Sequence, residues 1–272
     1  MLKTRVVTAL VLLAILLSVV YSESYPFFIL VAAAFFAAAA WESFRLFHNR
    51  RPLVGAALWT LAFVLLVYRD APDSTTLLFG LCAAIWAIRL APSLSIGLPA
   101  LEGFGNRLLN GIYGIAILGC FLAIVVLFQH SPLYLLSVMA IVWIADIGAY
   151  FSGKAFGKHK LAPSISPGKS WEGAIGGWLA VLILTGISTL HPAFADTFAT
   201  RLVTKSGWLG FGLVMTIMVA ASVVGDLFES QLKRRAGMKD SSNLLPGHGG
   251  VLDRIDALIP ALPLAVLFDS WI

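Results

Sequence analysis

The sequence predicts an all-α protein, a polytopic integral membrane helical bundle of about nine transmembrane helices with its N-terminus inside and its C-terminus outside. Hydrophobic residues make up 59% of the 272 positions, and the mean hydropathy is +0.90. Both values exceed those of a soluble domain, about half of which is apolar. The apolar runs have the length of membrane helices and lack the alternation of outer-membrane strands, so a helical bundle is favoured over a barrel.

The first apolar run covers residues 6–21 and follows Lys3 and Arg5. Its length also suits a secretory signal peptide, cleaved near Val20-Tyr21-Ser22, so a removable leader is an alternative to a first membrane helix. Several of the further spans are short for a perpendicular crossing. They are expected at 26–47, 53–68, 75–91, 109–129, 132–151, 172–190, 208–228 and 252–270.

The distribution of Lys and Arg sets the expected orientation, because cytoplasmic loops of membrane proteins are rich in these residues. With a cytoplasmic N-terminus, sixteen of the 19 basic residues fall inside, and three fall outside: Arg69, Arg201 and Lys205. We therefore expect an integral protein of the cytoplasmic (inner) membrane. Its charged loops at 152–171 and 230–252 would face the cytoplasm, where nucleotides are available.

We divide the chain into residues 1–108, N-terminal membrane helices with a linker, and residues 109–272, a catalytic membrane region. The first three spans carry no polar cluster and are expected to serve packing alone, since small residues allow helices to approach closely. Segment 89–111 is rich in Gly, Pro and Ser, and is a linker or part of a substrate entrance.

Cysteine usage and net charge exclude other classes. Cys82 and Cys120 both lie in apolar runs, which indicates neither a disulfide framework nor a thiolate metal site. The formal charge of +5 is spread over short loops. A membrane surface or phosphorylated substrates are thus favoured as partners over nucleic acid.

The densest group of charges lies between residues 226 and 256. Its first half has helical spacing, which puts acids and a base on one face: Asp226, Glu229, Ser230 and Lys233. Asp253 and Asp256 repeat this spacing after a Pro-Gly-His-Gly-Gly loop, whose glycines permit positive φ and let backbone N–H groups approach an anion. Such a stretch suits a divalent cation together with a polyphosphate. A solvated loop between membrane helices is the alternative.

A second charged block covers residues 146–173. Asp146 and Tyr150 lie one helical turn apart near the end of a span. An acidic side chain there costs enough free energy that a functional role is expected. Lysines and glycines follow that suit phosphate binding: Lys154, Lys158, Lys160 and Lys169 with Gly153, Gly157 and Gly168. Alternatively, Ser170 or Ser166 simply caps the next helix, with Glu172 favourable in its first turn. The pattern alone does not decide between these readings.

Both blocks resemble the phosphatidate cytidylyltransferases, the CDP-diacylglycerol synthases. The run from Ser230 to Asp256 is similar to the signature of that family without departure: Ser-x-Leu-Lys-Arg-x4-Lys-Asp-x-Ser-x2-Leu-Pro-x-His-Gly-Gly-Val-x-Asp-Arg-Ile-Asp. The earlier block has the family's Asp-x3-Tyr-x2-Gly-Lys run, which leads into Ser-Pro-x-Lys-Ser-x-Glu-Gly. The resemblance covers at least residues 146–173 and 226–256, and generic apolar helices elsewhere.

This resemblance implies transfer of a cytidylyl group from CTP to phosphatidate in the bilayer. It assigns Mg²⁺ to Asp226 and Asp256, with a second cation such as K⁺ between them, and leaves a homodimer open. The implied catalytic set is Lys233, Arg234, Lys239, Asp240, His248, Asp253 and Arg254. In it, Asp240 and Asp253 orient bases rather than bind metal. The implied substrate-binding set is Asp146, Tyr150, Lys154, Lys169, Ser170, Glu172, Ser230, Gly249 and Gly250. A transporter of a phosphorylated or anionic substrate, using Asp146 and Asp226 as coupling sites, is the alternative function.

Overall fold

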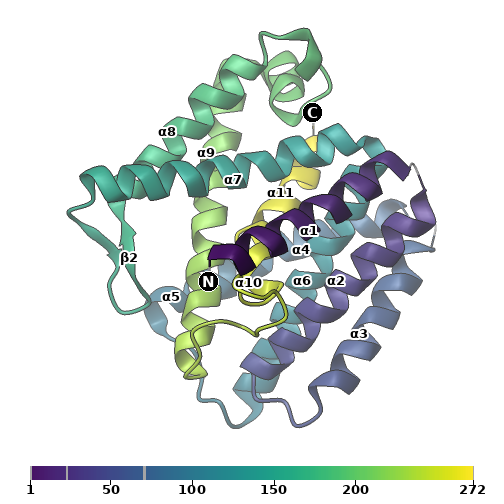
Figure 1. Cartoon of the computed structure of the whole chain (residues 1–272), viewed down its shortest axis with the longest axis vertical. Coiled ribbons are helices and arrows are strands. Elements are labelled where there is room, and N and C mark those ends of the chain that lie inside the picture. The colour runs from purple at the N-terminus through teal and green to yellow at the C-terminus, as the bar shows by residue number, and fades with distance from the viewer. Residues whose placement is uncertain (1, 23, 70–71, 272) are drawn as a thin grey trace.

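Figure 1 shows the protein as a computed structural model, which describes residues 2–22, 24–69 and 72–271. The α-helices are α1 (Leu2–Ser22), α2 (Tyr25–Leu46), α3 (Pro52–Val67), α4 (Pro72–Ile85), α5 (Ser93–Ile96), α6 (Phe104–His130), α7 (Pro132–Phe156), α8 (Trp171–Ser188), α9 (Phe198–Arg235), α10 (Leu252–Ile255) and α11 (Leu258–Asp269). A π-helical turn η1 (Trp86–Leu90) and a 3₁₀ turn η2 (Pro192–Phe194) add to these. Two short strands, β1 (Lys160–Ala162) and β2 (Ser166–Ser170), form an antiparallel hairpin.

The structure confirms an all-α membrane bundle, to which the hairpin is a small addition. Seven segments of the described residues are long and apolar enough to cross a membrane: Lys3–Ser22, Tyr25–Leu46, Thr76–Ile96, Phe104–His130, Pro132–Phe156, Trp171–Ser188 and Phe198–Arg235. The other two expected positions hold α3 and α11, apolar helices of only 16 and 12 residues.

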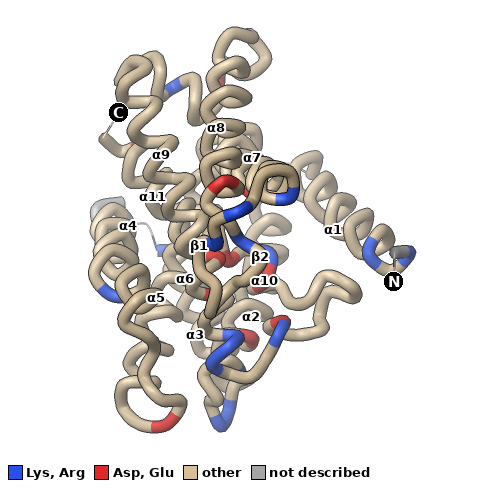
Figure 2. Tube along the Cα trace, turned by 90° about the vertical axis from the view of Figure 1, so that its left-hand side faces the viewer, with Lys and Arg blue, Asp and Glu red and all other residues tan. Residues whose placement is uncertain are grey.

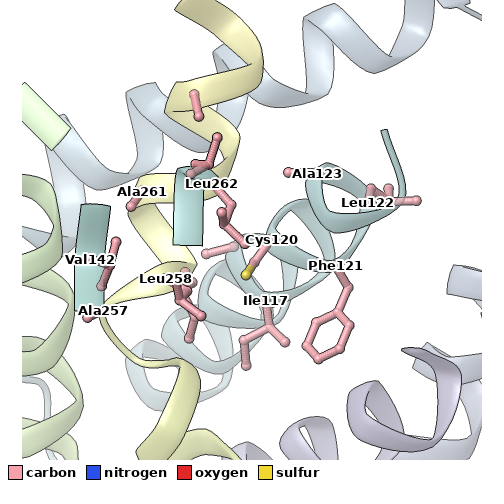
Figure 3. Close-up of a cluster of buried hydrophobic side chains, with 14 of the residues drawn as sticks. Ile117, Cys120, Phe121, Leu122, Ala123, Val142, Ala257, Leu258, Ala261 and Leu262 are labelled. Carbon is pink, nitrogen blue, oxygen red and sulfur yellow. The ribbon is translucent and has the colours of Figure 1, made fainter. Parts of the chain in front are cut away.

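The centre of the bundle is the contact between α6 and α11 (Figure 3). Ile117 and Cys120 of α6 and Leu258, Ala261 and Leu262 of α11 are fully or almost fully buried there. Burial of this apolar surface fixes α11 inside the bundle, and with it the polar residues that immediately precede α11.

Helices α7 and α8 form a tightly packed pair beside this core. A Cβ atom on Gly177 of α8 would lie only 2.4 Å from the Ala145 carbonyl oxygen of α7. Small residues on both helices thus allow the two backbones to approach closely, as is common in membrane proteins. The pair carries the hairpin at its end (Figure 1).

The expected charged loops are shorter in the structure, because the helices extend beyond the apolar runs. Helix α7 continues to Phe156 and α9 continues to Arg235, although α9 is kinked at Gly207, where φ is 66°. The length of an apolar run indicates only the part of a helix that crosses lipid. The helix itself can continue into the polar region beyond the membrane. The expected last span, 252–270, is also not continuous, since α10 ends at Ile255 and α11 begins at Leu258.

Candidate active site

A cavity of about 590 Å³ lies where α7, the hairpin, α8, α9 and α10 meet. Figure 2 shows acidic and basic positions gathered around β1, β2 and α10, whereas the surrounding helices are mostly uncharged. The polar side chains that line the cavity are Asp146, Tyr150, Lys154, Ser166, Lys169, Ser170, Asp226, Asp253, Arg254 and Asp256. The two charged blocks of the sequence, about 80 residues apart, therefore contribute to one cavity.

The close approach of α9 to the break between α10 and α11 brings Asp226 and Asp256 to the same wall of the cavity. It occurs at Gly225, where an added Cβ would lie 2.5 Å from the Asp256 carbonyl oxygen and 2.8 Å from Pro260 Cδ. Any side chain at this position would push the two segments apart. Gly225 thus sets the separation of the two carboxylates that the resemblance assigns to metal.

The charges around Asp226 and Asp256 fit a bound cation. Lys169 Nζ lies 2.5 Å from Asp226 Oδ2, and the Ser230 hydroxyl donates to Asp226 Oδ1 at 3.3 Å. Asp256 precedes α11, outside the long membrane-crossing helices. Its burial and the nearby charge of Asp226 raise the pKa of its carboxyl group to about 7. A cation bound beside Asp226 and Asp256 would relieve the repulsion between their carboxylates.

The carboxylates alone do not form a complete coordination sphere. Over residues 2–22, 24–69 and 72–271, no group of three or more His, Cys, Asp and Glu side chains is placed to hold a metal ion. Mg²⁺ in nucleotide enzymes is usually held by one or two carboxylates plus water and substrate phosphates, so the Asp226–Asp256 pair is compatible with it.

Lys233 is held between two carboxylates rather than extended into the cavity. It pairs with Glu229 one turn earlier on α9, and its Nζ lies 2.6 Å from Asp253 Oδ1. Asp253 also accepts hydrogen bonds from the Gly250 N–H at 2.7 Å and the Ser241 N–H at 2.9 Å. Burial opposes ionisation of Asp253, but the bonds from Lys233 and Gly250 outweigh it and lower its pKa.

The loop before α10 is a tight turn with the glycine geometry that its sequence predicts. The Leu245 N–H donates to the Gly249 carbonyl and the His248 N–H to the Leu245 carbonyl, both at 2.8 Å. Gly247 and Gly249 have φ of 76° and 84°, values that favour glycine. The backbone N–H of Gly250 does approach an anion, but this anion is the protein's own Asp253.

Ser170 caps α8, which is one of the two roles that the sequence left open. Its hydroxyl accepts a hydrogen bond from the Gly173 N–H at 3.2 Å, and the side chain also lines the cavity. Glu172 faces the turn before the hairpin, where His159 Nδ1 lies 2.6 Å from its Oε1 and the Lys158 N–H donates to its Oε2. Glu172 therefore anchors the hairpin and lies outside the cavity lining.

The remaining residues of the two predicted sets do not line the cavity: Arg234, Lys239, Asp240, His248, Ser230, Gly249 and Gly250. Arg234 donates to the Ile165 carbonyl at 3.5 Å and so contacts the turn of the hairpin. Lys239 and Asp240 are exposed, whereas His248 is half-buried.

The expectation that the first three spans serve packing alone is wrong for Glu42 of α2. This fully buried carboxylate accepts hydrogen bonds from the Val251 N–H at 3.0 Å and the Leu252 N–H at 2.6 Å. Sequence reasoning missed Glu42. An acidic residue within the apolar run 26–47 was a usable signal, since a buried charge in a membrane helix needs partners.

A bundle of apolar helices around a cavity rich in carboxylates and lysines defines a membrane protein with a site for an anionic substrate. The chain belongs to the cytidylyltransferase family, since the family model described as "Cytidylyltransferase family" matches residues 3–271.

Named relatives support the family assignment. The chain is similar to a phosphatidate cytidylyltransferase of Pseudomonas aeruginosa, with 42% identity over 97% of this chain and 95% of the relative. It is 38% identical to the one of Haemophilus influenzae over the full length of both. The one of Brucella melitensis is 45% identical over 49% of this chain and 45% of its own length. None of these similarities favours a transporter.

Proposed function

We propose that this chain transfers the cytidylyl group of CTP to phosphatidate, forming CDP-diacylglycerol and pyrophosphate for phospholipid biosynthesis. The observation that carries this proposal is the single cavity that combines Asp226 and Asp256 with Lys169 and Arg254. A cytidylyltransferase needs such a combination, because it must bring two anions together and stabilise charge on the α-phosphate and the leaving pyrophosphate. The names of the two full-length relatives support the same substrates.

The chemistry needs no covalent intermediate, since the lipid phosphate is itself a nucleophile. One of its oxygens attacks the α-phosphorus of CTP, and a new P–O bond forms. The bond between the α-phosphorus and the bridging oxygen breaks, and pyrophosphate leaves with the electron pair. Lys154, Lys169 and Arg254 line the cavity and would neutralise the phosphates. Lys233 stays in its pair with Asp253 and fixes the end of α9 against α10.

Asp226 and Asp256 are the residues we propose to hold Mg²⁺, with a second cation such as K⁺ near the same pair. The divalent ion supplies Lewis-acid stabilisation of charge on the phosphoryl oxygens when it is bound. The pairing of Lys169 with Asp226 keeps an ammonium group at the same wall of the cavity.

We further propose nine crossings, with the N-terminus in the cytoplasm, the C-terminus outside and the active site facing the cytoplasm of the inner membrane. α3 and α11 would supply the two short crossings at about 24 and 18 Å of helix. The break before α11 precedes this short crossing and lines the polar cavity, so its backbone polar groups need not face lipid.

Single-cysteine labelling tests the orientation. The native Cys82 and Cys120 are both buried, which keeps the background low. A cysteine that replaces Lys239 should resist a membrane-impermeant reagent in intact cells and react after the membrane is opened. Reaction in intact cells would contradict the cytoplasmic placement.

The activity is tested with purified protein, phosphatidate, Mg²⁺ and each nucleoside triphosphate in turn. CTP should yield a liponucleotide and pyrophosphate. Diacylglycerol in place of phosphatidate should give no product, because it lacks the attacking phosphate. Equal turnover of diacylglycerol, or turnover without CTP, would contradict the proposed reaction.

A further inference from the structure

Glu42 of α2 is a buried carboxylate whose partners come from the other end of the chain. Its exposure is 0%, and among the described residues it takes part in no ion pair that would neutralise it. Three groups donate hydrogen bonds to it: the Ser242 hydroxyl (2.5 Å) and the backbone N–H groups of Val251 (3.0 Å) and Leu252 (2.6 Å). The Ser241 hydroxyl lies 3.1 Å from Glu42, and its single proton is shared with a second acceptor. Such bonds are what make a buried, unpaired charge tolerable.

The partners of Glu42 belong to the segment that carries the cavity residues. Ser241 donates from its N–H to Asp253 Oδ2 at 2.9 Å, and its hydroxyl lies 2.8 Å from the same oxygen. Glu42 and Asp253 therefore share the Ser241 hydroxyl, and Asp253 in turn pairs with Lys233 of α9. Arg254 and Asp256, which line the cavity, follow within one turn.

The close approach of Gly250 tightens this arrangement. A Cβ on Gly250 would lie 2.3 Å from Glu42 Oε1 and 2.1 Å from the Ser241 hydroxyl oxygen. The carboxylate thus occupies the space that a side chain at position 250 would need, and the segment is folded around it. Contacts between α2 and α10 continue this interface.

We propose that Glu42 is a positioning residue for the cytidylyl-transfer site: it fixes segment 241–252 so that Asp253, Arg254 and Asp256 meet α9 at the cavity wall. This inference rests on the proposed function. It gives α2 a role in the reaction, although no residue of α2 lines the cavity.

The decisive variant is Glu42→Gln in the full-length protein, in nanodiscs. Gln has the size of Glu but only one acceptor oxygen. Its NH₂ group replaces the second carboxylate oxygen, and this donor would face N–H or O–H donors. We expect kcat to fall about 10-fold to 100-fold per folded molecule, with a smaller change in KM for CTP. Amide hydrogen exchange of peptides from segment 241–252 should accelerate, while that of α6 and α11 stays unchanged. Glu42→Asp should recover part of the loss.

Ser43→Ala is the matched control, because Ser43 is the next residue of α2, is 3% exposed, and its hydroxyl has no hydrogen-bond partner. It should leave kcat and exchange unchanged. If Glu42→Gln does not fold, Ser242→Ala removes one donor to Glu42 while the carboxylate keeps its backbone donors Val251 and Leu252. It should still accelerate exchange of segment 241–252 and lower kcat.

Two results would overturn the proposal: an unchanged kcat with normal exchange in Glu42→Gln, or a lower yield and melting temperature with normal kcat in the folded fraction. Where both variants fold, Ser242→Ala should add little in the Glu42→Gln background, and independent effects would also count against it. If wild-type protein makes no CDP-diacylglycerol, the proposed function fails, while the exchange measurement still decides whether Glu42 positions the segment.

Discussion

Gly225→Ala tests whether the spacing between α9 and the break before α11 creates the site. The new methyl group would lie 2.5 Å from the Asp256 carbonyl oxygen and 2.8 Å from Pro260 Cδ, so backbone must move by several tenths of an ångström or more. Overpacking of this kind costs about 1–3 kcal/mol. Alanine regains about 1 kcal/mol of helix propensity, so the net loss of stability should be only about 0–2 kcal/mol.

The expected loss of activity is larger than this loss of stability. A shift near 1 Å between Asp226 and Asp256 should lower turnover about 10²-fold, equivalent to about 2.7 kcal/mol of transition-state stabilisation. Gly212→Ala in the same helix is the control, because no atom lies within 4 Å of its added Cβ. Liponucleotide formation per folded molecule and the melting temperature should be measured for both variants. Turnover of Gly225→Ala equal to that of Gly212→Ala would refute the argument that this contact sets the carboxylate separation.

Further predictions concern single carboxylates. Asp226→Asn and Asp256→Asn should each lower turnover about 10²-fold and raise the half-saturating Mg²⁺ concentration at near-normal protein yield; unchanged Mg²⁺ dependence in both would mean that the metal is elsewhere. Asp240→Asn should raise the CTP requirement with a smaller loss at saturation, because the proposed role of Asp240, which is exposed and outside the cavity, is to hold Lys239 or Arg234 in place rather than to bind metal; a shifted Mg²⁺ optimum would contradict this role. In the short loop between η2 and α9, hydrogen bonds from Ser131 and His130 lower the pKa of Asp196. Asp196 thus stabilises the fold above the unfolded pKa of about 3.9, and this contribution is lost as pH falls through its lower folded pKa. Asp196→Asn should lower the melting temperature at pH 7 but not in strong acid, and a pH-independent difference would exclude this linkage.

The sequence alone determined the class of fold and the identity of the charged blocks. Uninterrupted apolar runs indicate membrane-crossing helices directly, because each crossing segment must be apolar over its own length. The motif from Ser230 to Asp256 carried enough fixed polar positions to indicate the family, which the match over residues 3–271 confirmed. Local turn chemistry was readable in part. Gly247 and Gly249 adopt positive φ as expected, whereas the cap at Ser170 was one of two roles that the pattern left open, and the structure shows it.

Only the tertiary structure decided which of these residues share a site. Asp146 and Asp256 lie in different motifs, and packing of α7, α8, α9 and α11 places both at one cavity. Lys233 carries the same charge as Lys169, yet only the structure shows that Lys233 is enclosed by Glu229 and Asp253. Glu42 lies about 200 residues before its partners, and local pattern carries no information on contacts at such separation. A charged side chain's role depends on which groups desolvate and neutralise it, and in this protein packing of distant helices supplies those groups.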